Sequence, residues 1–261
     1  MPQITSVAVT HTGLRRESNE DAFRERQDLG LYVVADGMGG HEAGEVASRL
    51  TVQVIEQFID DTRNADLNQT WPFPFDTAHS LAANRLIAAL RLANQRVASA
   101  IGADPELKGM ATTAVAILLQ PAGMAQVAHV GDSRAYQWRE GKLRQLTDDH
   151  SWVGEQVRAG VLTDDDAQRH PWRNVVTRAI SGGVDPEVDI KEVDLKAGDR
   201  LLMCSDGLSS VVPPARLSEL MNKPGELAAC AQSLINAANA AGGPDNITVI
   251  LVEVDAAGDV A

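Results

Sequence analysis

The feature that most constrains this chain is a set of turns in which an acidic residue stands at the end of an apolar, strand-like run. In the clearest case, at 33–41, two valines and an alanine lead into Asp36, and three glycines follow within four positions. Glycines are used where the backbone must turn unusually or be approached closely. Four other segments carry a similar acidic turn: 19–23, 128–134, 201–207 and 242–251.

Two interpretations of these turns remain open from the residues alone. Asp36 by itself fits an ordinary strand-to-helix turn in which the carboxylate caps the helix. Five acidic turns beside buried strands instead indicate that the carboxylates gather at one oxygen-rich site for hard cations. On the second interpretation, the sequence predicts a divalent-metal site formed by distant parts of the chain.

Composition limits the class of protein. A chain of 261 residues with 44% apolar content can bury a sizeable core, and we expect one domain over residues 1–261. The net charge of −13 disfavours nucleic acid and anionic membranes as partners. Only Cys204 and Cys230 occur, so neither a disulfide framework nor a zinc ribbon is indicated. The chain lacks a signal-like start and any apolar run of about 18 residues. We expect a cytoplasmic monomer.

Local patterns predict alternating sheets and helices. Alternation at 4–10 predicts a strand, and a hairpin around 27–30 would bring Asp21 and Asp36 to neighbouring strand ends. Apolar residues at helical spacing predict a helix just beyond the glycines and a second at about 81–101, covering one sheet face. Later elements are expected as strands at 111–119, 125–130, 135–139, 142–145, 199–204 and 248–254 and a helix at 226–240.

Two further segments carry polar side chains of interest. The stretch at about 152–183 is polar, and its periodic segments are short. We expect it to form a flap that flanks the site and tunes substrate choice. Arg158 and Arg173 are expected to be exposed on this flap. At 147–150, Thr147 or Asp148 could cap a helix, and His150 could be a buried structural histidine.

The acidic turns belong to a larger set of motifs. Six segments match, in order, the sequence motifs of one protein family: 16–21, 36–41, 131–134, 146–151, 205–208 and 245–248. With these motifs the chain, over residues 6–254, resembles the metal-dependent PP2C (PPM) family of Ser/Thr protein phosphatases, in its bacterial branch. The resemblance implies an α+β fold, a four-layer α-β-β-α sandwich of two antiparallel sheets flanked by helices. That fold agrees with the predicted meander and paired helices.

The resemblance also implies the metal ligands. Asp36 would bridge two Mn²⁺ or Mg²⁺ ions, and the Gly37 carbonyl would bind one of them. Asp206 and Asp245 would bind the other ion, and Asp132 together with Asp206 matches a third, weaker metal position. Hard cations prefer such an all-oxygen sphere, so no cysteine or histidine cluster is needed.

The remaining roles implied by the resemblance concern water and phosphate. Glu20 and Asp21 would hold metal-bound waters, and a bridging hydroxide would attack phosphorus in line without a phosphoenzyme. Arg16 would hold the phosphate oxygens, since a guanidinium matches them bidentately. From the local sequence alone, Arg15 and Arg16 could equally neutralise Glu20 and Asp21.

The chain departs from the family pattern at three places. Ala111 stands where a glycine is usual, residues 181–183 replace a commoner Leu-Gly, and Met38 stands where animal enzymes carry a histidine. Because methionine cannot donate a proton, we hypothesise that His41 protonates the leaving group. His41 could instead be a helix-start histidine bonded to a neighbouring turn.

The implied partners are phosphorylated proteins, above all those of a cognate Ser/Thr kinase. The main alternative is a catalytically inactive phosphoprotein-binding regulator with the same fold. The retained Asp36, Asp206 and Asp245 disfavour this alternative. A metal-dependent nuclease would use similar carboxylates, but the chain shows no basic or aromatic tracking surface for nucleic acid.

Overall fold

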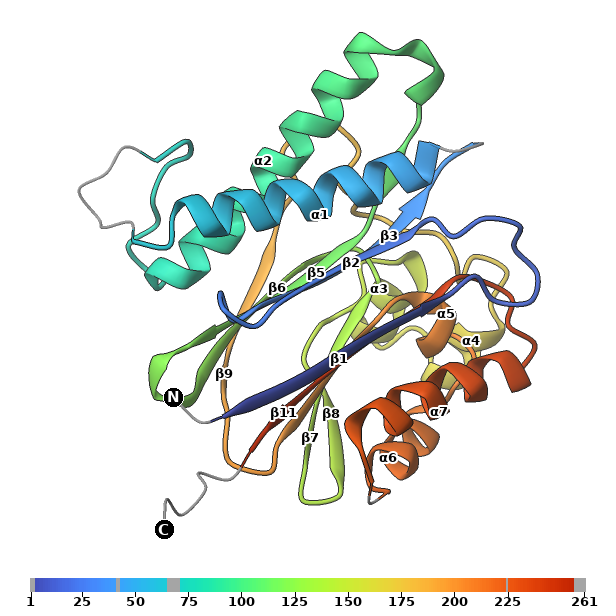
Figure 1. The fold of residues 1–261 in the computed structure, drawn as a ribbon. Coiled ribbons are helices and arrows are strands. Elements are labelled where there is room, and N and C mark those ends of the chain that lie inside the picture. Colours follow the sequence, from blue (N-terminus) through green and yellow to red (C-terminus); the bar gives the residue numbers. More distant parts are fainter. Residues whose placement is uncertain (1–2, 41–42, 65–70, 224, 256–261) are drawn as a thin grey trace.

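The protein is described here by a computed structural model covering residues 3–40, 43–64, 71–223 and 225–255. Two antiparallel sheets lie face to face, with helices on both outer sides (Figure 1). The predicted four-layer α-β-β-α sandwich is therefore confirmed.

The first sheet holds both the earliest and the latest strands of the chain. Its strands follow the spatial order β1 (Ile4–His11), β11 (Ile247–Val254), β10 (Arg200–Cys204), β7 (Arg134–Arg139) and β8 (Lys142–Gln145). Its outer face is covered by α5 (Asp206–Ser209), α6 (Pro214–Met221) and α7 (Leu227–Ala240).

The second sheet contains the predicted hairpin. Its order is β2 (Asp21–Arg26), β3 (Leu31–Met38), β5 (Ala114–Gln120), β6 (Met124–Val130) and β9 (Asp189–Asp194), and β4 (Ala111–Thr112) pairs separately with β3. Figure 1 shows α1 (Ala43–Asp61) and α2 (Leu81–Ala103) lying across its outer face. Short 3₁₀ turns lie at Pro105–Leu107 and Pro121–Gly123.

Strand β3 shows why the sandwich forms. Leu31, Val33 and Ala35 pack toward α1 and α2, whereas Tyr32 and Val34 pack into the layer between the sheets. A strand buried on both faces needs a continuous apolar run, because successive side chains point to opposite sides. Complete burial of a Leu or Val side chain is worth about 1.5–3 kcal/mol, so both layers of this core stabilise the strand that carries Asp36.

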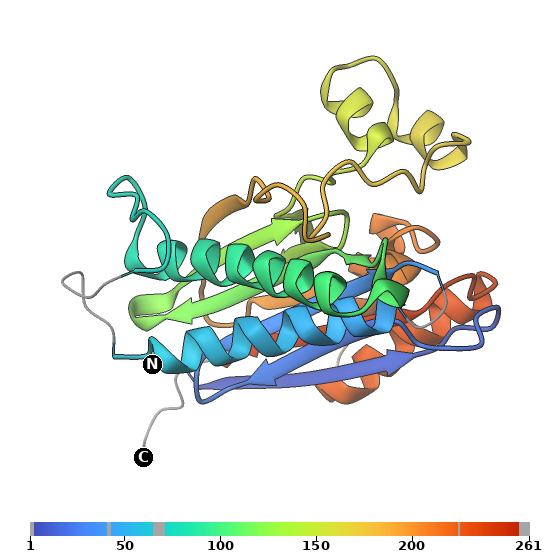
Figure 2. The same cartoon turned by 90° about the horizontal axis from the view of Figure 1, so that it is seen from above.

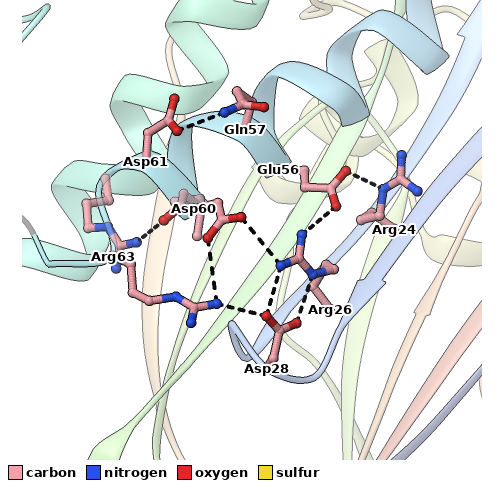
Figure 3. Close-up of polar contacts among 10 residues, drawn as sticks. Arg24, Arg26, Asp28, Glu56, Gln57, Asp60, Asp61 and Arg63 are labelled. Atoms are coloured by element: carbon pink, nitrogen blue, oxygen red, sulfur yellow. Dashed lines mark hydrogen bonds and ion pairs between the residues drawn. The ribbon is translucent and has the colours of Figure 1, made fainter.

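An ion-pair network connects the β2–β3 hairpin to α1 (Figure 3). Arg26 contacts Asp28 on its own hairpin and Glu56 on α1, both at 2.8 Å, and Arg63 contacts Asp28 at 2.8 Å. Surface ion pairs contribute only about 0–1 kcal/mol each. The network therefore orients α1 against the hairpin more than it stabilises the fold.

The segment between β8 and β9 leaves the sandwich and projects from it (Figure 2). It contains α3 (Trp152–Arg158) and α4 (Asp164–Arg169). Thr163 and Asp166 form a reciprocal capping box at the start of α4. The Trp152 ring stacks on His170 at 4.7 Å between centroids, which connects the two helices of this excursion.

Some elements differ from the sequence-based expectation. The expected strand at 111–119 is divided into β4 and β5, because the backbone at Thr113 turns to donate to Asp36 O at 2.9 Å. Strand β9 was not predicted, since four of its six residues are charged, as suits the outermost strand of a sheet. Helix α6, which starts at Pro214, was also missed. Among the described residues, no helix combines the length and apolar character needed to cross a membrane.

Candidate metal centre

The acidic turns converge at one end of the sandwich. Asp36 lies near the end of β3, directly opposite Asp21 at the start of β2, as the predicted hairpin requires. Asp206 follows β10, and Asp245 precedes the neighbouring β11. Asp132 occupies the corner between β6 and β7 and is buried.

The carboxylates of this cluster perturb one another. Burial, and then the charges of Asp21, Asp206 and Asp132, raise the pKa of Asp36 well above its usual range. Burial together with neighbouring carboxylates raises the pKa of Asp21 to about 7 and that of Asp132 to about 8. The same causes raise the pKa of Asp206 to about 6. Crowded carboxylates at a solvent-accessible edge hold protons or cations, because their charge cannot accumulate unpaired.

Asp21 is held so that one of its oxygens lacks a partner. The hydroxyls of Ser205 and Thr248 both donate to Oδ2 at 2.7 Å, whereas Oδ1 is buried without a hydrogen bond. A buried acceptor of this kind requires a donor. Water on a hard cation would supply it, so the site fits the Mn²⁺ or Mg²⁺ that the family resemblance implies. Sequence reasoning gave no role to Ser205 or Thr248, although both lie in the motifs.

Two glycines allow the backbone to close around Glu20. A Cβ on Gly37 would lie 2.2 Å from Gly44 O and 2.5 Å from Glu20 O. A Cβ on Gly44, in the first turn of α1, would lie 2.1 Å from Glu20 Oε2. A Cβ at Gly37 would overlap main-chain atoms, and one at Gly44 would displace the Glu20 side chain, so the Gly37 carbonyl, Glu20 and the start of α1 form one tightly packed edge of the site.

Asn246 organises the loop that carries Arg16. Its Oδ1 accepts the Glu20 N–H at 2.7 Å, and its Nδ2 donates to the carbonyls of Thr12 and Ser18 at 2.9 and 2.8 Å. This bridge links the residue after Asp245 to both ends of the loop before β2. Sequence reasoning missed this role, because Asn246 was noted only as part of a motif.

Arg16 lies at the rim of the carboxylate cluster. Its side chain is 52% exposed and its Nη2 is 2.7 Å from Asp245 Oδ2. The ion-pair partner is thus Asp245, rather than Glu20 or Asp21 as the neutralisation hypothesis expected. Since the guanidinium is both exposed and next to the cluster, it can reach an anion that enters from solvent.

A groove of about 700 Å³ leads away from the cluster. Asp132 and Asp206 line it on the sandwich, and Pro214 lines it at the start of α6. Arg158 and Arg173 line it from the 152–183 segment. The two arginines singled out from the sequence therefore face the same space as two of the candidate metal ligands.

A second group with metal-ligand atoms is His129, His150 and Asp189, whose atoms lie within 4.8 Å of one another. His150 Nδ1 accepts the Gly131 N–H at 3.2 Å, so its Nε2 carries the proton and points at Asp189, 3.3 Å away. Arg178 lies 3.1 Å from the same carboxylate. Because the lone pair of His150 Nδ1 already accepts a hydrogen bond and Arg178 already pairs with Asp189, these contacts agree with the expected structural role of His150.

His41 lies outside the described residues, so the structure describes nothing of its surroundings. Its proposed part in protonating the leaving group stays a prediction.

Comparison with known proteins gives the family of the chain. The model of the protein phosphatase 2C family matches residues 12–248. The chain belongs to the protein phosphatase 2C family. The Ser/Thr phosphatase Stp of Listeria monocytogenes is 36% identical over 252 residues, covering 94% of each chain. The Ser/Thr phosphatase PstP of Mycobacterium tuberculosis is 40% identical over 243 residues, which are 93% of this chain but 43% of PstP.

Solved structures of the family have the same fold. A crystal structure of M. tuberculosis PstP/Ppp superposes with a TM-score of 0.83 at 36% identity, covering 97% of this chain and 99% of that one. The catalytic domain of PstP in complex with 2 manganese ions gives a TM-score of 0.80 at 35% identity, with the same coverage. The present chain thus spans less than half of full-length PstP and nearly all of the solved PstP chains.

Proposed function

We propose that this protein is a metal-dependent phosphatase that hydrolyses phosphoserine and phosphothreonine in proteins. The observation that carries the proposal is the convergence of Asp21, Asp36, Asp132 and Asp206, whose charges and burial raise the pKa of the carboxyl groups. Membership of the protein phosphatase 2C family and the named phosphatase relatives support the reaction.

In this proposal Asp36, Asp206 and Asp245 hold two core ions, Mn²⁺ or Mg²⁺, together with the Gly37 carbonyl. When bound, such ions supply Lewis-acid activation of water and neutralise phosphate charge. Asp132 with Asp206 holds a third ion.

The protein groups around these ligands orient water and phosphate. Glu20 and Asp21 accept hydrogen bonds from water at the site, and the unpaired Asp21 Oδ1 supports this role. Arg16 binds two oxygens of the substrate phosphate from the rim. Its exposure and its position beside Asp245 support that assignment. Proton donation to the departing serine or threonine oxygen is proposed for His41.

The substrates are proposed to be phosphorylated proteins, including those of a cognate Ser/Thr kinase, with no nucleic-acid or membrane partner. We further propose one phosphatase domain over residues 1–261, acting as a cytoplasmic monomer, with a substrate-selecting flap at 152–183. The open groove beside Arg158 and Arg173 supports the flap. A catalytically inactive phosphoprotein-binding regulator would conflict with the complete set of carboxylates.

Activity with added metals tests the function. The purified chain should hydrolyse both p-nitrophenyl phosphate and a phosphothreonine peptide with Mn²⁺ or Mg²⁺, and EDTA should abolish both reactions. Asp36→Asn, which removes the bridging charge, should be inactive while remaining folded by circular dichroism. Phosphopeptide binding without turnover under every metal condition would instead support the regulator. Full activity of metal-stripped protein would overturn the metal assignment.

A further inference from the structure

Thr112 and Thr113, at the break between β4 and β5, hold the main chain of Asp36 on both sides. The Asp36 N–H donates to Thr113 Oγ1 at 3.1 Å, and the Asp36 carbonyl accepts from Thr113 N–H at 2.9 Å. The Thr112 hydroxyl also donates to that carbonyl, at 2.8 Å. Both threonines are fully buried. These bonds restrict the backbone of Asp36, and therefore the direction of its carboxylate.

Thr113 also contacts the corner that carries Asp132. Its hydroxyl pairs with that of Ser133 at 2.7 Å, in a buried side-chain hydrogen bond. Gly131, on the other side of Asp132, has a φ of +108°, and a Cβ there would lie 2.5 Å from Thr113 Cβ. Thr113 therefore fits between the turn of Asp36 and both neighbours of Asp132.

The hydrogen bonds of Thr113 to Asp36 and Ser133 oppose the electrostatic repulsion between Asp36 and Asp132. Thr113 bonds both to Asp36 and to Ser133, the neighbour of Asp132, and ionised carboxylates on turns held this close repel each other. Without a restraint, the two turns would lower their energy by moving apart, and a cation would have to draw them together on binding. A rigid support removes this cost and thereby raises affinity. Groups bonded to metal ligands commonly change metal affinity by about 10–100-fold.

We propose that Thr113 is a positioning residue that sets the separation of Asp36 and Asp132, and so determines the affinity for the divalent ions they hold. The inference rests on the proposed function, because it presumes the metal centre. Thr113 touches neither the substrate nor the reacting atoms. It acts through the Asp36 amide and through Ser133.

Calorimetric titration with Mn²⁺ alone tests the proposal without relying on activity. Thr113→Val keeps the shape of the side chain but removes the hydroxyl, and the affinity for at least one ion should fall by about 10-fold or more. Thr113→Ser retains the hydroxyl and should restore the isotherm of the parent. Ser133→Ala should weaken the ion that Asp132 holds, and the double variant Thr113→Val/Ser133→Ala should bind no more weakly than Thr113→Val, because both changes break the same bond.

Thr51→Val is the matched control. Thr51 on α1 is buried like Thr113, but its hydroxyl has no hydrogen-bond partner, so the same substitution should leave the Mn²⁺ isotherm unchanged. An unchanged isotherm for both Thr113→Val and Ser133→Ala would overturn the positioning role. An equal loss in Thr113→Val and Thr113→Ser would also overturn it, since the hydroxyl would then not matter. A parent protein that binds no Mn²⁺ would instead reject the proposed function.

Discussion

The guanidinium of Arg16 and the carboxylate of Asp245 form an ion pair across 229 positions of the chain, with Nη2 2.7 Å from Oδ2. The pair puts the proposed phosphate-binding cation directly against a proposed metal ligand. Any anion held by Arg16 is therefore also held next to the carboxylate cluster, and the two sites can act on the same phosphate.

Loss of the Arg16 guanidinium should weaken catalysis strongly. A hydrogen bond to a charged group is worth about 1.5–3 kcal/mol, so Arg16→Ala should lower kcat/KM on a phosphothreonine peptide by roughly 10–150-fold. Arg16→Lys should recover part of this loss, because it keeps the charge but not the bidentate fork. Arg15→Ala, a neighbouring exposed arginine, is the control. Similar kinetics for Arg16→Ala and Arg15→Ala would reject the phosphate-binding role.

Asp132 is predicted to govern an ion that is distinct from the tightly held pair. Asp132→Ala should fold, keep the two tight ions and lose one weaker Mn²⁺ in calorimetry, with a marked fall in turnover. The buried carboxylate and its neighbour Asp206 supply the physical reason, since removing one ligand leaves too few oxygens for that ion. An unchanged stoichiometry together with normal turnover would show that Asp132 does not bind a functional metal.

The metal-free protein should lose stability as pH rises. The pKa values of Asp21, Asp132 and Asp206, about 7, 8 and 6, lie above the ordinary value of 3.8, so the folded state holds these protons more tightly than the unfolded chain. Their stabilising contribution is present below about pH 4 and is lost as pH rises toward 8. The Tm in EDTA should therefore fall between pH 5 and 8.

Mn²⁺ should reverse this trend. Because cations compete with protons for the carboxylates, the gain in Tm on adding Mn²⁺ should grow across the same pH range. Asp132→Asn removes one of the carboxyl groups whose pKa is raised. The fall of Tm with pH in EDTA should therefore be less steep in this variant. A Tm in EDTA that is constant or rising over pH 5–8 would contradict the raised pKa values of these buried carboxyl groups.

Asn246 should control the order of the Arg16 loop. Its side chain makes three hydrogen bonds to the main chain of Thr12, Ser18 and Glu20, and each buried group left unpaired costs about 1–3 kcal/mol. Asn246→Ala should therefore lower Tm and speed amide hydrogen exchange over residues 12–20. Gln232→Ala, an exposed amide on α7, should do neither. Unchanged exchange in Asn246→Ala would disprove the bridge.

The flap should affect protein substrates more than small ones. Arg173 lines the groove and is exposed, so Arg173→Ala should raise KM for a phosphopeptide but hardly change KM for p-nitrophenyl phosphate, which offers no peptide chain for Arg173 to contact. Arg158→Ala should act in the same direction. Equal changes for both substrates would indicate that the segment is purely structural.

Local patterns in the sequence predict the layers of the fold and the types of candidate metal ligand. The continuous apolar run of β3 must be buried on both faces, and the helical spacing after Gly40 must place α1 on a sheet, because these periods follow from local backbone geometry. The acidic turns likewise predict candidate oxygen donors, since the preference of hard cations depends on side-chain chemistry rather than on position. The hairpin pairing of Asp21 with Asp36 also follows from a short turn.

The tertiary structure alone decided which groups meet. The contacts of Arg16 with Asp245, of Asn246 with Glu20 and of Thr113 with Ser133 join segments separated by 229, 226 and 20 positions. No local period encodes them, because they depend on how the sheets are ordered and on the exact register of their strands. The break at Thr113 and the charged outer strand β9 have the same origin. In both cases a long-range hydrogen bond outweighs the local preference of the residues.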